Sequence, residues 1–204
     1  MKRAMTLVRL LVAALIVAAV INDLRDAITG GDFNFWNFFG YFTIQTNLIA
    51  AATLIIAARF TGLERPQWVE YLRAFAATYL VIVISVYWTL LAPTADNKWE
   101  WSNLVLHGLS CLVLVADWLI EGPRTRLPLR HVWLVLVYPV VWLIVILIRG
   151  ATDGWFPYPF LDPDKGYASI AVVVAGIFVA GLVLGGVMFS VTRWRRLVPA
   201  VSGP

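Results

Sequence analysis

Six long apolar segments alternate with short polar stretches along the chain. They cover approximately residues 6–22, 38–58, 71–91, 101–120, 131–148 and 167–191. A helix needs about 20 apolar residues to cross a hydrocarbon core of roughly 30 Å. The pattern therefore predicts an all-α polytopic integral membrane protein, in which residues 1–204 form a single domain, one bundle of six transmembrane helices.

The composition agrees with this prediction. Of the 204 residues, 61% are hydrophobic and 14% are charged, whereas soluble domains are usually about 45–50% apolar and about 25% charged. The single cysteine, Cys111, cannot form an intramolecular disulfide, so the fold does not depend on an oxidising compartment. With one cysteine and two histidines, we expect no metal site, and we expect no cofactor.

Basic residues are distributed unevenly between the two sides of the predicted membrane. With the N terminus inside, 12 of the 16 Lys and Arg residues fall on the inner side. Because cytoplasmic loops carry an excess of Lys and Arg, we expect both termini to be cytoplasmic. The net charge of +4 is then explained by orientation, and we expect no nucleic-acid partner. The inner residues are Lys2, Arg3, Arg9, Arg59, Arg65, Arg73, Arg124, Arg126, Arg130, Arg193, Arg195 and Arg196, and the outer ones are Arg25, Lys98, Arg149 and Lys165.

The first segment has one alternative interpretation. Lys2 and Arg3 precede an apolar run that ends near the small residues Ala18 and Ala19, which is also typical of a secretory signal peptide. Cleavage would leave five spans. Retention of the segment gives the consistent charge asymmetry described above, so we expect six.

Several polar side chains interrupt the start of the second segment, in the stretch Gly40 to Asn47. At helical spacing, Thr43, Thr46 and Asn47 share one face. Polar groups in hydrocarbon cost several kcal/mol unless they are paired. This face is therefore either a polar seam between helices or part of a functional site.

His107 is the one histidine in the interior of a predicted span, since His131 stands at the inner boundary of the fifth. It has two interpretations: a packed residue with satisfied hydrogen bonds, or a functional ionisable group. Thr43 should lie about 7 Å below the outer surface and His107 about 9 Å below it, from the helical rise per residue. If the two helices touch, a hydroxyl nucleophile and an imidazole base can meet.

Other residues are candidates for supporting such a pair. Gln45, Asn47 or Asn103 could donate to a developing oxyanion, and Thr46 offers a second hydroxyl close to Thr43. Asp23, at the outer end of the first span, could orient the histidine, although it also fits a solvated interfacial carboxylate. Asp117 is about 15 Å from His107 along the same helix and is too far away for this role.

The fifth connection and the sixth span carry two further patterns. The loop 154–163 contains three prolines that restrict its backbone. It could cap the outer mouth of a site, or its aromatic residues, Trp155 and Tyr158, could anchor it at the interface. Gly181 and Gly185 form a GxxxG pattern that allows close helix packing, within the bundle or in a homodimer.

The segment Tyr41 to Asn47, the six-span plan and the loop from Trp155 to Pro163 resemble the bacterial Pr6Pr membrane proteins. More distantly, the Thr43 segment and His107 are similar to the androgen-induced membrane hydrolases of animals. In those relatives, a threonine and a histidine hydrolyse fatty acid esters of hydroxy fatty acids. The resemblance implies that Thr43 is a nucleophile, that His107 is a base, and that the protein resides in a bacterial plasma membrane.

Two hypotheses about function follow. The first is an intramembrane hydrolase of a lipid ester that enters from the outer half of the bilayer, with membrane lipids around it. The second is a non-enzymatic multi-span protein, either a small transporter or an accessory subunit, because Thr, Gln and Asn side chains often hydrogen-bond between spans. Whether Thr43 and His107 are in contact is the first observation that can distinguish these two hypotheses.

Overall fold

The computed structural model describes residues 2–31, 33–94, 99–123 and 125–191. Within these ranges the chain is all-helical, as predicted, and six helices are long and apolar enough to cross a membrane. These helices are Lys2–Thr29, Phe42–Arg59, Gln67–Leu91, Trp101–Ile120, Leu129–Thr152 and Tyr167–Val191. Five of the basic residues assigned to sides of the membrane, Lys98, Arg124, Arg193, Arg195 and Arg196, lie outside the described residues.

The first two spans are regular helices with recognisable boundaries. The first, α1 (Lys2–Thr29), runs seven residues beyond the predicted end, because no helix breaker occurs before Gly30 and Gly31. Gly31 has a φ of +87°, a conformation that glycine adopts without strain and that commonly ends helices. The second, α3 (Phe42–Arg59), begins directly after the extended residue Tyr41.

The third, fourth and fifth spans contain irregular turns. The third consists of α4 (Gln67–Val86) and a π-helical turn, η1 (Tyr87–Leu91); the fourth consists of α5 (Trp101–Leu104), a π-helical turn, η3 (Val105–Leu109), and α6 (Ser110–Ile120). The fifth begins as a 3-10 helix, η4 (Leu129–Leu136), and continues as α7 (Val137–Thr152). Pro139 lacks the N–H that an α-helix would pair with the carbonyl of Val135, which favours the change at this point.

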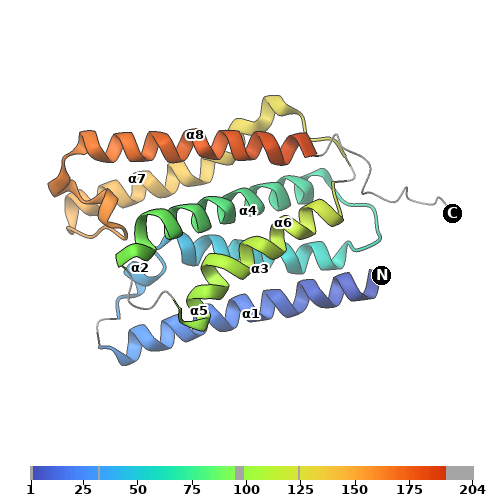
Figure 1. The fold of residues 1–204 in the computed structure, drawn as a ribbon, viewed down its shortest axis with the longest axis horizontal. Helices are drawn as coiled ribbons and strands as arrows, with labels where there is room; N and C mark the ends of the chain where they lie inside the picture. The colour runs from blue at the N-terminus through green and yellow to red at the C-terminus, as the bar shows by residue number, and fades with distance from the viewer. Residues whose placement is uncertain (1, 32, 95–98, 124, 192–204) are drawn as a thin grey trace.

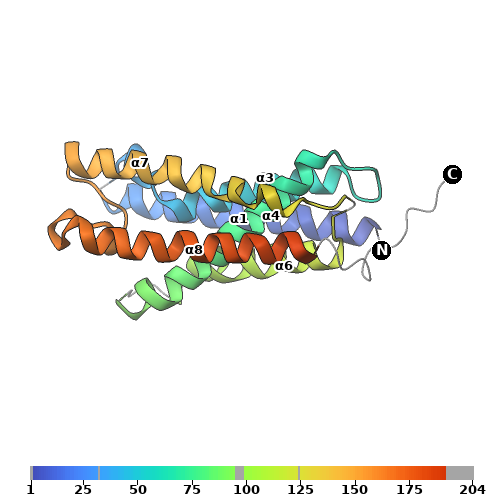
Figure 2. The same ribbon diagram turned by 90° about the horizontal axis from the view of Figure 1, so that it is seen from above.

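The helices run side by side with alternating direction (Figures 1 and 2). In Figure 1, α7 and α8 (Tyr167–Val191) lie at the edge opposite α1, with α3, α4 and α6 between them. The start of α1 and the end of α8 lie at the same end of the bundle. We call this the inner end, following the predicted orientation, and the opposite end the outer end.

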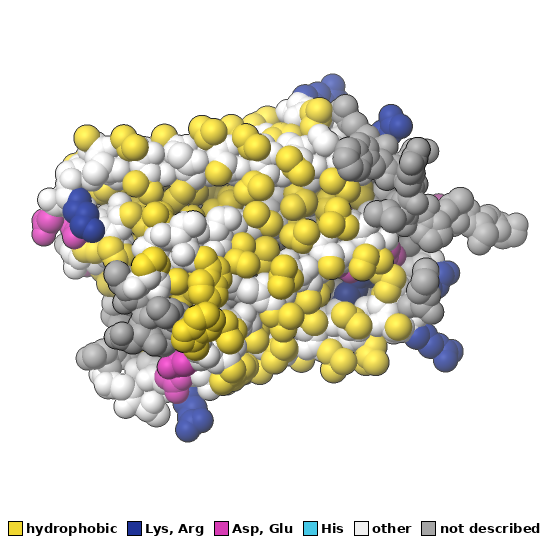
Figure 3. All heavy atoms as spheres, viewed as in Figure 1, with side chains coloured by type: hydrophobic (Ala, Val, Ile, Leu, Met, Phe, Trp, Pro, Cys, Tyr) yellow, Lys and Arg dark blue, Asp and Glu magenta, His cyan; other side chains and the backbone are white. Residues whose placement is uncertain are grey.

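Side chains on the surface follow the pattern of a membrane protein. Hydrophobic side chains cover the middle of the visible face, and the charged side chains gather toward the two ends (Figure 3). Large apolar residues such as Leu11, Ile144 and Val172 are more than half exposed on α1, α7 and α8. These surfaces suit hydrocarbon, in which apolar groups need no cover.

At the inner end, three arginines and three carboxylates form a buried network, which we call the inner ion-pair network. Asp117 on α6 accepts from Arg9 Nε at 2.6 Å and from Arg73 Nη2 at 2.8 Å. Glu70 pairs with Arg65 and with Arg73, both at 3.1 Å. The three positive and three negative formal charges cancel. Because the partners come from α1, α4 and α6 or their ends, the network links these helices. Its members are Arg9, Arg65, Glu70, Arg73, Asp117 and Glu121.

Gly181 and Gly185 face the inside of this bundle. A Cβ atom at Gly181 would lie 3.4 Å from Ile82 Cδ1, and one at Gly185 would lie 3.3 Å from Val135 Cγ1. Both glycines therefore allow α8 to approach α4 and η4 closely. A homodimer through the same glycines stays a prediction.

Candidate active site

Thr43 is the second residue of α3, and the start of α3 lies toward the outer end of the bundle (Figure 1). The backbone before it is held by Trp142, whose Nε1 donates to the carbonyl of Gly40 at 2.9 Å. A Cβ atom at Gly40 would lie 2.5 Å from Cη2 of Trp155 and 2.8 Å from the carbonyl oxygen of Trp36. Any side chain at position 40 would clash with Trp155 and Trp36, so glycine is required there. This close contact fixes the position at which α3 begins.

His107 lies in the π-helical turn η3, where it departs from helical geometry with a φ of −114° and a ψ of 18°. A π-helical turn breaks the regular pairing of backbone groups and is frequent at functional sites. Side chains from neighbouring helices bind two carbonyls here. Asn47 Nδ2 donates to the carbonyl of Leu106 at 3.0 Å, and Trp88 Nε1 donates to that of His107 at 2.9 Å.

The structure brings Thr43 and His107 together. The distance between Thr43 Oγ1 and His107 Nε2 is 3.3 Å, so the two helices touch at these side chains and the condition for the pair is met. The other ring nitrogen, Nδ1, lies 3.3 Å from the carbonyl oxygen of Asn103. A carbonyl only accepts, so in the neutral ring Nδ1 carries the proton and Nε2 presents its lone pair to the threonine hydroxyl.

Tyr87 holds the imidazole from the side. Its ring stacks on that of His107 with centroids 3.8 Å apart and an angle of 22° between the planes. Its hydroxyl accepts from Asn103 Nδ2 at 2.5 Å. Because Tyr87 belongs to the π-helical turn η1, two such turns on neighbouring helices meet at the imidazole and restrict its orientation.

Tyr158 completes the surroundings of Thr43 and was not predicted as a site residue. Its hydroxyl accepts from the backbone N–H of Thr43 at 3.3 Å and lies 3.4 Å from Thr43 Oγ1. Burial raises the pKa of the Tyr158 phenol to about 12, so it keeps its proton at neutral pH. Pro157 and Pro159 on either side restrict this backbone, and they are the sequence signal that could have pointed to it.

The polar residues of α3 make hydrogen bonds that hold the site. Gln45 Nε2 donates to the carbonyl of Phe39 at 2.6 Å, and Gln45 Oε1 accepts from Tyr138 at 2.6 Å. Thr46 donates to the carbonyl of Phe42 at 2.8 Å. Asn47 donates to the carbonyl of Thr43 at 3.0 Å, in addition to that of Leu106. The candidate oxyanion donors Gln45, Asn47 and Asn103 thus have other partners in this structure.

Asp23 was the candidate for orienting the histidine. It lies on α1 near Ser102 of α5. The atom that faces Nδ1 of His107 is the carbonyl oxygen of Asn103, four residues earlier on the same span. A backbone carbonyl group therefore lies at the position where the sequence suggested a carboxylate.

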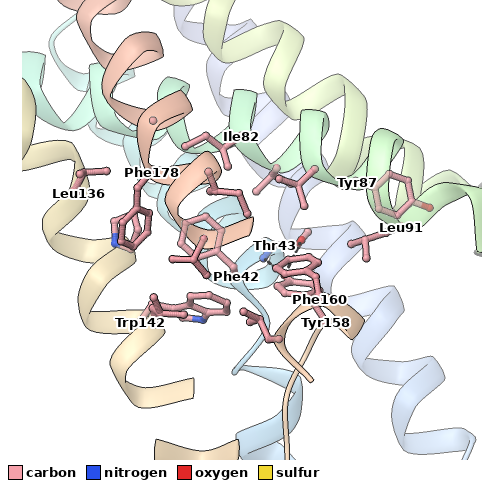
Figure 4. A pocket seen from close by; sticks show the side chains of 18 of the residues that line it. Phe42, Thr43, Ile82, Tyr87, Leu91, Leu136, Trp142, Tyr158, Phe160 and Phe178 are labelled. Atoms are coloured by element: carbon pink, nitrogen blue, oxygen red, sulfur yellow. Dashed lines mark hydrogen bonds between the residues drawn. The ribbon is translucent and has the colours of Figure 1, made fainter. Parts of the chain in front are cut away.

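An apolar cavity lies directly beside Thr43 (Figure 4). Its walls come from α3, α4, η4 with α7, α8 and the loop that carries Tyr158. Its volume is about 70 Å³, several times the roughly 10–15 Å³ that one water requires. Within the described ranges, no group of three or more His, Cys, Asp and Glu residues is arranged to hold a metal ion. The cavity surface is almost entirely hydrocarbon, and the lining residues that carry a polar group are Thr43, Tyr87, Trp142 and Tyr158.

Fold and site together define a polytopic integral membrane protein with a hydrogen-bonded threonine–histidine pair beside an apolar cavity. The chain belongs to the FAR-17a/AIG1-like protein family, whose model matches residues 5–191.

One curated relative is the UPF0641 membrane protein YHR140W of Saccharomyces cerevisiae, which is 30% identical over 110 residues. This similarity covers 46% of the present chain and 46% of the yeast protein, so the chain spans about half the length of that relative. No solved structure matches the chain.

Proposed function

We propose that this protein hydrolyses lipid esters, with Thr43 as the nucleophile and His107 as the general base. The observation that carries the proposal is the 3.3 Å contact between Thr43 Oγ1 and His107 Nε2. A hydroxyl is a weak nucleophile at its own pKa and needs a base within hydrogen-bond reach. The carbonyl of Asn103 favours the ring tautomer that can accept the proton.

The reaction proceeds in two steps. Thr43 Oγ attacks the ester carbonyl carbon while His107 Nε2 takes the hydroxyl proton, and a tetrahedral intermediate forms. The intermediate collapses to an acyl-threonine, and the alcohol leaves with the proton from His107. Water then attacks the acyl group, His107 takes a proton from the water and returns it to the threonine oxygen, and the fatty acid is released.

The oxyanion of each tetrahedral intermediate requires hydrogen-bond donors. Two donors lie next to Thr43 Oγ1: the backbone N–H of Thr43 itself and the hydroxyl of Tyr158. The N–H belongs to the first turn of α3, where the helix dipole also favours negative charge. Substrate binding would exchange their mutual hydrogen bond for bonds to the oxyanion.

The substrate class follows from the surroundings of the pair. The cavity beside Thr43 is apolar, and the site lies within the outer part of a membrane-spanning bundle, so a lipid can reach it from the bilayer. The family resemblance adds fatty acid esters of hydroxy fatty acids as substrates. By the same resemblance, we propose that the protein belongs to the Pr6Pr group and resides in a bacterial plasma membrane.

A non-enzymatic role is the second candidate, either as a small transporter or as an accessory subunit. The observation in its favour is that Gln45, Thr46 and Asn47 all make internal hydrogen bonds that join helices or close a helical turn. Such a polar seam needs no substrate. Solute flux in reconstituted vesicles without ester hydrolysis would support this role.

The first prediction concerns the pair itself. Thr43→Ala and His107→Ala should each lower kcat for lipid ester hydrolysis by about 100-fold or more, because general base catalysis contributes about that much. Thr43→Ser should retain measurable activity, since it keeps the hydroxyl. Purified variants are compared on defined lipid esters and by labelling with a fluorophosphonate probe.

Thr53→Ala is the matched control. Thr53 is a buried threonine on the same helix, and its hydroxyl donates to the carbonyl of Ile49 at 2.7 Å. It should hydrolyse and label like the wild type. Wild-type turnover in both Thr43→Ala and His107→Ala would refute the assignment.

A further inference from the structure

The cavity beside Thr43 extends along the helix axes, because its lining runs from Ile82 to Leu91 on the third span and from Val174 to Gly181 on α8. Its outer end is lined by Leu91, Tyr158 and Phe160, and its inner end by residues deeper in the bundle, including Ile82 and Leu136. Figure 4 shows Thr43 between these two groups, with Tyr158 and Phe160 on one side and Ile82 and Leu136 on the other.

The inner end is closed at Gly181. A Cβ atom there would lie 3.4 Å from Ile82 Cδ1 and 3.4 Å from Leu136 Cδ2. On α8 the cavity wall runs from Val174 to Gly181, which is roughly 10 Å along the helix axis. A side chain larger than methyl at position 181 would occupy the inner end or push the neighbouring residues apart.

The polarity of the walls specifies the occupant. The hydroxyl-bearing wall residues are Thr43, Tyr87 and Tyr158, and the inner end has only hydrocarbon side chains. The Tyr87 hydroxyl is already hydrogen-bonded to Asn103 Nδ2. The indole N–H of Trp142, also on the wall, already donates to the carbonyl of Gly40. A polar headgroup at the inner end would lose its hydrogen bonds at a cost of several kcal/mol, whereas a hydrocarbon chain would not.

We infer that this cavity binds the acyl chain of the ester, with the carbonyl carbon at Thr43 and the chain running inward, and that Gly181 limits the chain length. The inference rests on the proposed function, because the position of the carbonyl is defined by the nucleophile. It assigns the acyl part of the substrate to the cavity, and it leaves the alcohol part on the side of Thr43 away from Gly181. Gly181 is thus a specificity-determining residue that does not take part in the chemistry.

The test compares Gly181→Leu and Gly181→Ala with Gly186→Leu. A Cβ atom at Gly186, on the same helix, meets no atom within 4 Å, so its leucine projects into open space and serves as the matched control. Rates are measured on nitrophenyl esters of butyrate, octanoate, dodecanoate and hexadecanoate. Gly181→Leu should lose about tenfold or more of kcat/KM on octanoate, the ester whose extended acyl chain matches the length of the cavity, while butyrate stays within about twofold.

Gly181→Ala adds one methyl group at ordinary contact distance and should show a smaller shift in the same direction. It also keeps the test informative if the leucine variant does not fold. Gly186→Leu should keep the wild-type profile. A folded Gly181→Leu protein with the wild-type chain-length profile, or with equal loss on all four esters, would overturn the inference.

Binding measurements separate this inference from the proposed function. Saturable binding of radiolabelled octanoate, whose extended chain matches the span of the cavity from Val174 to Gly181, should survive Thr43→Ala and should be lost in Gly181→Leu. Binding with this pattern but without ester turnover in the wild type would overturn the hydrolase and support the acyl site. Turnover that depends on Thr43, without any chain-length effect at Gly181, would overturn the acyl site and leave the hydrolase standing.

Discussion

At the scale of single residues, the site depends on which atoms surround Thr43 and His107. The imidazole is fixed by three contacts, namely Thr43 Oγ1, the carbonyl of Asn103 and the stacked ring of Tyr87. No carboxylate is among these contacts. The arrangement differs from a Ser-His-Asp triad, in which a buried carboxylate holds the ring and stabilises its protonated form.

Tyr158 is the residue whose role can be tested most directly. Tyr158→Phe removes one proposed oxyanion donor and keeps the aromatic ring, so kcat should fall by about 100-fold, while KM changes little. Steady-state kinetics on one lipid ester measure both constants.

Tyr71→Phe is the control for this prediction. The Tyr71 hydroxyl is hydrogen-bonded to His131 Nδ1 at 2.6 Å, near the inner end and away from Thr43. Its removal should leave kcat at the wild-type value. An unchanged kcat in Tyr158→Phe would exclude the phenol from oxyanion stabilisation.

At the scale of elements, close approaches and irregular turns place the site. The close approach of Gly40 to Trp155 fixes the start of α3 against the loop 154–163. The guanidinium of Arg149 lies over the Trp155 ring, 4.2 Å from its centroid. The two π-helical turns η1 and η3 then bring Tyr87 and His107 into contact. Regular α-helices in these positions would present other residues to Thr43.

Gly40→Ala should therefore disturb the site from outside the reacting groups. The added methyl group would lie 2.5 Å from the Trp155 ring and 2.8 Å from the Trp36 carbonyl, so α3 or the loop must shift. We expect a lower midpoint of thermal unfolding in detergent and a lower kcat. Gly176→Ala is the control, since a Cβ atom there meets nothing within 4 Å. Equal stability of the two variants would contradict this account.

At the scale of the whole molecule, the inner ion-pair network and the outer site lie at opposite ends of one bundle. Three arginines and three carboxylates are buried together at the inner end. Loss of one partner leaves the other charge buried without compensation, which costs about 3–5 kcal/mol. The network therefore stabilises the association of α1, α4 and α6 only while every carboxylate stays ionised.

Glu121, just beyond the end of α6, makes this stabilisation dependent on pH. Burial acts to raise the pKa of its carboxyl, but Arg65 and Arg9 outweigh burial and hold the pKa below the ordinary value of 4.5. A carboxyl whose pKa is lower in the folded state stabilises the fold above its ordinary pKa, and this contribution is lost as the pH falls through the folded pKa. The midpoint of thermal unfolding should therefore fall below about pH 4.5.

Two variants test the assignment to Glu121. Glu121→Gln should be less stable than the wild type near neutral pH and should show a weaker decline on acidification. Asp153→Asn should resemble the wild type, because the exposed ion pair with Arg149 contributes little. An identical acid profile in Glu121→Gln and the wild type would rule out Glu121 as the titrating group.

The sequence by itself determined the six spans, because a run of about 20 apolar residues has few stable arrangements other than a membrane-crossing helix. It also determined the relative depth of Thr43 and His107, since both positions follow from the helical rise and the point at which each span begins. The predicted side of the termini rests on the charge pattern alone. The arginines of the inner network belonged to that pattern, but their partners could not be deduced from it.

Only the tertiary structure decided which faces of the helices meet. The two π-helical turns change the direction of the side chains at Tyr87 and His107, and hydropathy contains no signal for them. The position of Tyr158 depends on how the loop folds back onto α3, and the inner end of the cavity lies where Gly181 of α8 packs against Ile82 and Leu136. Contacts between distant segments depend on packing, which apolar periodicity does not encode.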